Sequence, residues 1–518
     1  MTGAHTTDPL IGSEAGISPE TGTDSVTGEQ HEDSAFAPDS PLGDDTLHEE
    51  CGVFGIFGNA DAGALSVLGL HALQHRGQEA AGIVTFDKGQ FIAERHKGLV
   101  GDVFGRKTDA AKNLKGSFAV GHVRYSTSGG SNQRNIQPIF ADLAGGGIAI
   151  AHNGNLTNAH ALRSDLVAQG AIFQSTSDTE TIVQLAARST KKRIVDRLID
   201  ALRQVEGAYS LVALTSERLI GIRDPHGVRP LVLGDLDGSI IFASETCALD
   251  IIGATYVRDV KPGEVVVADK NGITSHFPFV QQPHRFCVFE YIYFARPDSV
   301  LEGHSVYEAR KNIGQVLAAE APVAADMVIP VPDSGVPAAL GFANAAGIPF
   351  ELGIIRNHYV GRTFIEPSES IRHLGVRLKH SPNRAKLKGK RVVLVDDSIV
   401  RGTTSKKIVE MVREAGAAEV HFRVSSPPTT HSCFYGVDTP NTNELLAHRM
   451  DVEQMRRFIG ADSLAFISMD GLYRAMGQAG RAAASPRFCD ACFSGDYPIS
   501  LTDVSGGTRQ LSLLADVA

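Results

Sequence analysis

The sequence predicts two consecutive domains of different class: an α+β domain built on sheets, then an α/β domain with a parallel sheet. With 518 residues, the chain exceeds what one hydrophobic core normally organises. From residue 51 to about 280, short β-like runs mix with a few helices. Beyond a boundary near residues 281–283, nearly continuous apolar strands alternate with helices, which is typical of a parallel sheet covered on both faces.

Individual segments support this division. In the first domain, we expect strands over residues 51–58, 117–124 and 147–153 and a helix over residues 179–187. In the second domain, we expect strands over residues 326–332 and 391–395 and a helix over residues 405–415. We expect the domains to span residues 51–280 and 281–470, with a C-terminal segment over 471–518.

Residues 1–50 have a different composition from the rest. They hold 12 Asp or Glu, no Lys or Arg, and Phe36 as the one aromatic residue. Such a segment cannot bury enough apolar surface to offset chain entropy, so we predict a disordered acidic leader. Removing it takes the formal charge from −10 to +2.

The remaining composition excludes several classes of function. The near-neutral body has no basic block, so no nucleic-acid partner is expected. No apolar run of about 18 residues and no signal peptide appears, so no membrane partner is expected either. Six cysteines in a chain of this length do not form a disulfide framework, and reduced thiols, a metal site or a nucleophile in a cytoplasmic protein are expected instead.

A ligand-binding loop is predicted where the strand 391–395 ends. Asp396 and Asp397 follow this strand, at the position where open α/β sheets bind ligands. Gly402, Thr403 and Thr404 then offer backbone N–H groups and hydroxyls at a helix start, which suits a phosphate. The carboxylates suit sugar hydroxyls or a pyrophosphate-bound Mg²⁺. An isolated Asp pair in this place would otherwise be a helix cap with a solvated neighbour.

The nine residues 396–404 resemble the phosphoribosylpyrophosphate loop of the type I phosphoribosyltransferases. The resemblance implies an α/β domain of that family, one Mg²⁺ held by Ser334, Asp396 and Asp397, and a mobile flap over residues 356–379. Ser334 lies in Pro332-Asp333-Ser334-Gly335, which matches the family's pyrophosphate loop. The residues implied to bind phosphoribosylpyrophosphate are Asp396, Asp397, Ser398, Arg401, Gly402, Thr403, Thr404 and the flap residue Arg362.

Cys51 begins the ordered region directly after the leader. Cleavage between Glu50 and Cys51 would free an α-amino group, with a pKa near ~8, beside the thiol. That amine can act as a general base toward the thiol. The alternative is that Cys51 is an ordinary buried strand cysteine.

Three further segments suit a glutamine-hydrolysing site. Arg124 offers a guanidinium for a carboxylate, and Asp178 near a helix start suits an ammonium. Asn153 and Gly154 end a strand with two donors that suit an oxyanion.

With residues 51–56 and 75–79, these segments resemble the class II, N-terminal-nucleophile (Ntn) glutamine amidotransferases. The resemblance implies an α+β Ntn hydrolase sandwich domain. It makes Cys51 the nucleophile, Asn153 and Gly154 the oxyanion hole, and Arg124 and Asp178 the glutamine-binding residues. Glutamine would form a γ-glutamyl thioester, release ammonia and leave as glutamate.

The combination of the two domains, with the connecting stretch 287–299, resembles the amidophosphoribosyltransferases over residues 51–500. The resemblance implies that glutamine, phosphoribosylpyrophosphate and water become 5-phosphoribosylamine, pyrophosphate and glutamate, the first committed step of purine synthesis. Ammonia would pass internally between the two sites. Purine nucleotides as feedback inhibitors and a homotetramer or homodimer are also implied.

The remaining cysteines suggest a second cofactor. Cys489 and Cys492 form a C-x-x-C pair, which by itself is a redox pair, half of a zinc site or a coincidence. In one branch of the resembled family, four cysteines in the positions of Cys287, Cys433, Cys489 and Cys492 hold a structural [4Fe–4S] cluster. Zinc is an alternative, because four cysteines suit both. Cys247 is expected to be a packing residue.

Two rival functions share one half of the chain each. Non-catalytic regulators that bind DNA also use the phosphoribosyltransferase fold, but the near-neutral body and the glutaminase motifs disfavour them. An amidotransferase that makes glucosamine phosphate would share the first half and lack the loop 396–404.

Overall fold

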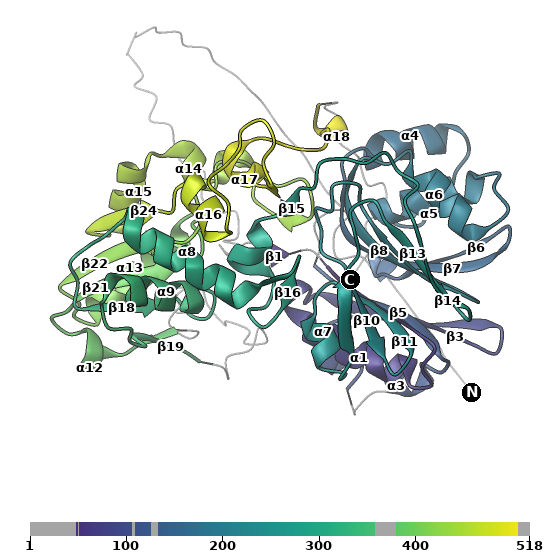
Figure 1. Ribbon diagram of the computed structural model, residues 1–518, viewed down its shortest axis with the longest axis horizontal. Helices are drawn as coiled ribbons and strands as arrows, with labels where there is room; N and C mark the ends of the chain where they lie inside the picture. Colours follow the sequence, from purple (N-terminus) through teal and green to yellow (C-terminus); the bar gives the residue numbers. More distant parts are fainter. Residues whose placement is uncertain (1–47, 50, 106–108, 126–132, 358–379, 506–518) are drawn as a thin grey trace, which may run out of the picture. The chain divides into compact units, whose positions relative to one another are not determined.

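The computed structural model describes residues 48–49, 51–105, 109–125, 133–357 and 380–505 (Figure 1). Two antiparallel sheets form the first domain. The first sheet has the order β12 (Thr255–Asp259), β10 (Val232–Leu236), β11 (Ser239–Ala243), β2 (Gly52–Phe57), β5 (Phe118–Arg124), β3 (Ala80–Asp87) and β4 (Gln90–Lys97). The second has the order β14 (Gly272–His276), β13 (Val265–Asp269), β9 (Leu219–Arg223), β8 (Gly207–Thr215), β7 (Gly146–Leu156) and β6 (Ile139–Leu143).

The alternation of side chains along β2 shows how these sheets are layered. Val53 and Phe57 join a core shared with Val212 of β8, so this face of the first sheet packs on the second sheet. Phe54 and Ile56 face the opposite side, which α1 (Ala62–Ala72) covers. On the far face of the second sheet lie α4 (Ala159–Ala168), α5 (Asp178–Arg188) and α6 (Ile194–Leu202) (Figure 1). The expected sandwich is confirmed.

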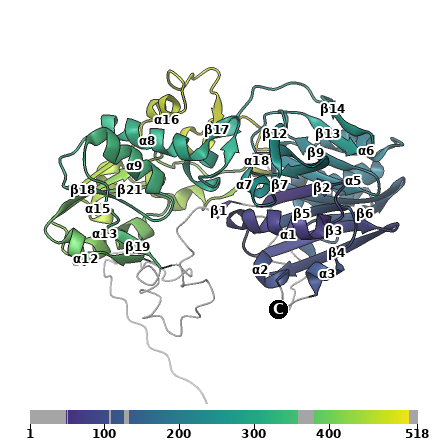
Figure 2. The ribbon, with the colours of Figure 1, turned by 60° about the horizontal axis from the view of Figure 1, so that its bottom comes forward.

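The second domain contains a parallel sheet, as the sequence predicts. Its order is β18 (Met327–Pro330), β21 (Arg391–Asp396), β22 (Glu419–Val424) and β24 (Ser463–Phe466). Val393 and Val395 of β21 face α8 (Val306–Glu320) and α9 (Val336–Ala346), which lie side by side in Figure 2. Val392 and Leu394 face α13 (Thr403–Glu414) and α15 (Val452–Ile459). The sheet is therefore covered on both faces.

Shorter helices and strands connect the main elements of the two domains. They are η1 (Gln74–Arg76), α2 (Val100–Val103), α3 (Ala110–Asn113), η2 (Gln133–Asn135), α7 (Cys247–Asp250), β16 (Val300–Leu301), β17 (His304–Ser305), β19 (Ile354–Arg356), β20 (His380–Pro382), α12 (Arg384–Leu387), η4 (Thr442–Glu444), α14 (Leu446–Arg449), α16 (Met469–Ala475) and α18 (Thr502–Ser505). Within the described residues, no helix is long and apolar enough to cross a bilayer.

Two residues of the acidic segment depart from the prediction for residues 1–50. His48–Glu49 form the short strand β1, which pairs antiparallel with β23 (Val437–Asp438), Glu49 opposite Val437. The prediction of disorder is wrong for these two residues, because the backbone of β23 offers them hydrogen-bonding partners that composition cannot reveal. The rest of the leader, residues 1–47 and Glu50, lies outside the described residues.

A buried ionic network connects the first domain to the stretch that leads into the second. Arg76 is fully buried and bonds to Glu245, while its NH2 group lies 2.6 Å from Oε2 of Glu290. Glu290 opens the π-helical turn η3 (Glu290–Phe294) and also accepts from Arg229 at 2.8 Å. Burial alone would raise the pKa of Glu245, but attraction to Arg76 and His75 outweighs it and holds the pKa well below its usual range.

The connecting stretch is held from the other side by α8. Arg310, a buried residue of this helix, donates to the carbonyl oxygens of Tyr291, Tyr293 and Ala295 at 2.9, 2.7 and 2.7 Å. The turn η3 is thus fixed by arginines from both domains.

We expect Arg76→Met to lower the free energy of unfolding by about 3–5 kcal/mol, because it leaves two buried carboxylates with less compensation. Chemical denaturation measures this. The matched control is Arg193→Met, which removes an exposed arginine paired with Asp196 and should leave stability unchanged. Equal effects from the two variants would contradict the importance of the network.

Candidate active sites

Cys51 lies directly before β2, in a backbone conformation rare for a residue other than glycine. Its φ is +87°, its side chain is 8% exposed, and its backbone N–H donates to the carbonyl of Arg76 at 3.1 Å. Residues other than glycine avoid this left-handed region unless the surrounding structure imposes it. Backbone strain of this kind is frequent at functional sites. The main chain of Arg76 therefore helps fix the predicted nucleophile.

Other predicted glutamine-site residues gather around the same end of β2. Gly52 pairs with Val123, so Arg124, the last residue of β5, lies at the same edge of the sheet, and it is buried. Ser244 connects this edge to β7: its hydroxyl accepts from the N–H of Val53 at 3.0 Å and from Nδ2 of Asn153 at 3.4 Å. Sequence reasoning missed Ser244, because a single serine after a strand carries no motif.

Asn153 and Gly154 lie on β7 in a buried and closely packed environment. Asn153 is fully buried, its donor Nδ2 lies 3.4 Å from the hydroxyl of Ser244, and its acceptor Oδ1 has no hydrogen-bond partner within the part of the chain that the structure describes. Gly154 has φ +139°, and a Cβ there would lie 2.0 Å from the carbonyl oxygen of Ala208. Only glycine fits this position, and its backbone N–H is therefore held in a conformation that another residue could not adopt.

Asp178 starts α5 and is tied to the same strand. Its Oδ2 accepts from the N–H of Leu156 at 3.0 Å, and its Oδ1 lies 3.6 Å from Nδ1 of His152. Burial favours the neutral acid, but His152 and the N–H of Leu156 outweigh it and hold the pKa of Asp178 below its usual value. Asp178 is thus an anion beside β7, and its role toward a substrate ammonium stays a prediction.

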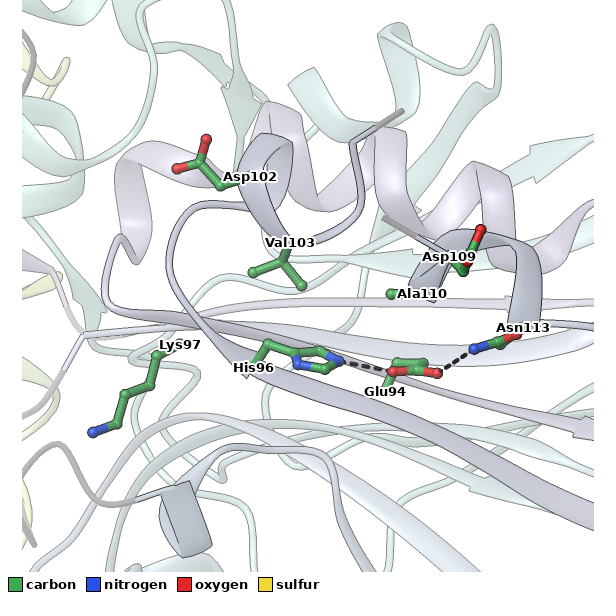
Figure 3. Close-up of a pocket in the computed structure, with 8 residues that line it drawn as sticks. All are labelled: Glu94, His96, Lys97, Asp102, Val103, Asp109, Ala110 and Asn113. Carbon is green, nitrogen blue, oxygen red and sulfur yellow. Dashed lines mark hydrogen bonds and ion pairs between the residues drawn. The ribbon is translucent and has the colours of Figure 1, made fainter. Parts of the chain in front are cut away.

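A surface pocket of about 410 Å³ lies elsewhere in the first domain, between β4 and the short helices α2 and α3. In Figure 3 the carboxylate of Glu94 lies between His96 and Asn113, at 2.7 and 2.8 Å. None of the predicted site residues lines this pocket.

In the second domain, two loops meet at the carboxyl edge of the sheet, as predicted. Asp396 ends β21, and Asp396 and Asp397 are each 7% exposed. The loop after β18 comes against β21, because Val331 donates to Val395 at 2.8 Å and a Cβ on Gly335 would lie 2.5 Å from Val395 O. Ser334 therefore lies in the loop that adjoins the acidic pair.

The turn from β21 into α13 is internally organised. The hydroxyl of Ser398 donates to Oδ2 of Asp397 at 2.6 Å, and Arg401 bonds to Glu444 at 3.0 Å. Gly402 has φ +79°, and α13 begins at Thr403. Thr403 and Thr404 thus lie in the first turn of a 12-residue helix, a position at which proteins commonly bind phosphate. Arg362 and the flap beyond Asn357 lie outside the described residues.

The four cysteines predicted to hold a cofactor are gathered by the fold. Cys287 and Cys489 are opposite each other in the parallel pair β15 (Phe286–Cys287) and β25 (Phe488–Cys489), and Cys492 follows in α17 (Ala491–Ser494). Burial raises the pKa of Cys489 and Cys492 well above the usual value of a thiol, and the proximity of Cys287 and Cys433 raises both further. Burial raises the pKa of Cys287 to about 12.

Asp490, between the paired cysteines, fixes their turn. It is buried and accepts from Tyr473 at 2.7 Å, Arg481 at 2.6 Å and Ser494 at 2.7 Å. Cys247 is buried under α1 in the core, as expected of a packing residue. Among the described residues, no three His, Cys, Asp or Glu side chains are arranged to hold one metal ion.

Comparison with known proteins identifies the family. A family model described as a glutamine amidotransferase domain matches residues 122–250, and one described as a phosphoribosyl transferase domain matches residues 298–427. The amidophosphoribosyltransferase of Rhizobium etli is 60% identical over 489 residues, which cover 93% of this chain and 98% of that protein. The amidophosphoribosyltransferase of Bacillus subtilis is 48% identical over 456 residues, which cover 88% and 95%.

A solved structure agrees with these matches. The glutamine phosphoribosylpyrophosphate amidotransferase from B. subtilis, complexed with ADP and GMP, has a TM-score of 0.83 at 47% identity, and the match covers 87% of this chain and 98% of that one. The chain therefore belongs to the amidophosphoribosyltransferase family, the glutamine-dependent pentosyltransferases that catalyse the first step of purine biosynthesis.

Proposed function

We propose that Cys51 is the glutaminase nucleophile and that the acidic pair after β21 is the phosphoribosylpyrophosphate site. The observation that carries the first assignment is the position of Cys51 at the start of β2, where its backbone is held by Arg76 and the next residues are linked through Ser244 to Asn153. Sγ of Cys51 attacks the carboxamide carbon of glutamine, and Asn153 and Gly154 donate to the developing oxyanion. Ammonia leaves, and water converts the γ-glutamyl thioester to glutamate.

The substrate's α-groups fit the two charged residues beside the nucleophile. Arg124 would receive the α-carboxylate, because a guanidinium forms paired hydrogen bonds with a carboxylate. Asp178, an anion by its environment, would receive the α-ammonium. Arg124 is buried and the side chain of Asp178 is 11% exposed, so these ion pairs would form with limited competition from water.

We propose that residues 1–50 are a propeptide and that cleavage makes Cys51 the first residue of the mature enzyme. The pairing of β1 with β23 supports this, because it holds His48–Glu49 immediately before the bond to be cut. The freed amine would take the thiol proton and return it to the departing ammonia.

The second site would place the phosphoribosyl group over the carboxyl edge of the parallel sheet. Asp396 and Asp397 would bind the ribose hydroxyls, while Ser398, Arg401 and the first turn of α13 (Gly402, Thr403, Thr404) would bind the 5-phosphate, with Arg362 closing over the substrate. Ser334, Asp396 and Asp397 offer the hard oxygen ligands that Mg²⁺ prefers, and the ion would neutralise the pyrophosphate leaving group. Internal transfer keeps the ammonia unprotonated and therefore nucleophilic.

We propose that Cys287, Cys433, Cys489 and Cys492 would hold a [4Fe–4S] cluster, with zinc as the alternative, because four thiolates suit both. The pairing of Cys287 with Cys489 and the position of Cys492 three residues later support a shared site. The cluster would supply a structural cross-link between the connecting stretch and the C-terminal segment.

The family resemblance also leads us to propose how the enzyme is regulated, how it assembles and where in the cell it lies. We propose purine nucleotides as feedback inhibitors, supported by the ADP and GMP complex of the B. subtilis protein. A homotetramer or homodimer in the cytoplasm is proposed from the family resemblance.

Cys51→Ala should abolish glutamine-dependent synthesis, by roughly 10³-fold or more, and keep synthesis from free ammonia at alkaline pH within about twofold. The two rates are measured by pyrophosphate release. The control Cys247→Ala removes a buried cysteine outside the site and should keep both activities. Loss of both activities in Cys51→Ala would contradict two separable sites.

Ser244→Ala should lower the kcat of glutamine hydrolysis about tenfold, because it leaves the buried N–H of Val53 without its acceptor and releases the amide of Asn153. Its matched control is Ser239→Ala, at the other end of β11, where the hydroxyl bonds to Asn59. If the two alanine variants hydrolyse glutamine at the same rate, Ser244 has no positioning role.

Removal of the cluster by oxygen or a chelator should eliminate absorption near ~400 nm and lower the melting temperature. The melting temperature should fall because the C-terminal segment is released from the connecting stretch. Cys489→Ser should reproduce it, and Cys247→Ala should not. A cluster-free preparation with full activity and an unchanged melting temperature would rule out the structural role.

A further inference from the structure

The proposed oxyanion strand touches a segment almost 280 residues later in the chain. Nδ2 of Asn155 donates to the carbonyl oxygen of Phe434 at 2.9 Å. Gly436 lies directly against Gly154, because a Cβ built on Gly436 would come 3.0 Å from Cα of Gly154 and 3.3 Å from its carbonyl carbon. The backbone that carries the proposed oxyanion donor is therefore in contact with the segment that begins at Cys433.

The contact confines Gly154 from two sides. Behind it, the carbonyl oxygen of Ala208 leaves no room for a Cβ, and in front lies Gly436, with φ +104°. A main chain between two backbone neighbours cannot rotate its N–H without moving one of them. The hydrogen bond from Asn155 fixes the distance between the two segments at the residue next to Gly154.

The segment 433–436 is itself firmly held. The N–H of Cys433 donates to Thr439 at 2.7 Å, and the N–H of Tyr435 donates to Sγ of Cys433 at 3.3 Å. Tyr435 is buried, and its hydroxyl donates to the carbonyl of Ile499 at 2.6 Å. A rigid support of this kind is what a preorganised donor requires.

We propose that Asn155 is a positioning residue of the glutaminase site, which aims the N–H of Gly154 by anchoring its strand to the carbonyl of Phe434. Asn155 touches no reacting atom in this arrangement. It acts on the two steps in which a tetrahedral oxyanion forms, the attack of Cys51 on glutamine and the attack of water on the thioester. The inference rests on the proposed oxyanion role of Gly154.

The test uses the mature full-length enzyme with Asn155→Leu, which keeps the approximate size and removes the donor. The kcat for glutamine hydrolysis should fall about 10-fold to 100-fold with KM changed less than about threefold, because a displaced donor weakens the transition state more than substrate binding. Synthesis from free ammonia should stay within about twofold, which also reports that the variant is folded.

A second measurement separates the oxyanion from the nucleophile. Alkylation of Cys51 by iodoacetamide forms no tetrahedral oxyanion, so its rate should be the same in Asn155→Leu and in the unchanged enzyme. The matched control is Asn158→Leu, which removes a similar bond, from Nδ2 to the carbonyl of Gln204 at 3.0 Å, three residues further along the chain. This control should keep the kcat for glutamine.

These measurements decide whether Asn155 positions the N–H of Gly154. An unchanged kcat for glutamine in Asn155→Leu, or an equal fall in alkylation and hydrolysis, overturns the positioning role. If Asn155→Leu fails to fold, Asn155→Ala, which removes the donor and adds neither bulk nor charge, gives the same comparison. Failure of the underlying site assignment is distinguishable, because Cys51→Ala would then keep glutamine-dependent synthesis.

Discussion

The buried guanidinium of Arg76 is the constraint on which the arrangement of the first site depends. Its side chain neutralises Glu245 and Glu290, and its main-chain carbonyl receives the N–H of Cys51. Carboxylates in a dry interior need a cation at hydrogen-bond distance, so the positions of these groups are mutually fixed. The strained start of β2 and the turn η3 consequently belong to one rigid framework, although more than 200 residues separate them.

The buried cation Arg310 interacts electrostatically with the acidic pair after β21 and with the ionic network around Arg76. The charges of Asp397, Glu245 and Glu290 all act on Arg310, whose pKa burial lowers to about 10. Arg310 also binds three carbonyls of the connecting stretch, so α8 is oriented by the same contacts that hold η3. The link between the domains is therefore built from charged and backbone groups of defined direction, which specify one geometry where apolar packing alone tolerates several.

Local patterns were enough to predict the class of each domain and several of its strands and helices, and the rest depended on contacts between distant segments. The helix expected over residues 179–187 is α5, Asp178–Arg188, and the strand expected over 391–395 is β21 with Asp396 added. Both follow from hydrophobic periodicity and capping. Ser244 and the partners of Arg76 could not be predicted, because a lone serine or glutamate acquires its role only from a strand brought against it by folding.

The contact between Gly154 and Gly436 also joins distant parts of the chain, because it brings the segment 433–436 against the strand β7. Two glycines face each other because neither backbone leaves space for a side chain, and both adopt positive φ. Close approach of two main chains transmits displacement directly, since no flexible side chain lies between them to absorb it. Whatever fixes Cys433 and the buried Tyr435 thus also limits the movement of the strand that carries the proposed oxyanion donors. A cofactor bound at Cys433, as proposed, would therefore affect the position of these donors without taking part in their chemistry.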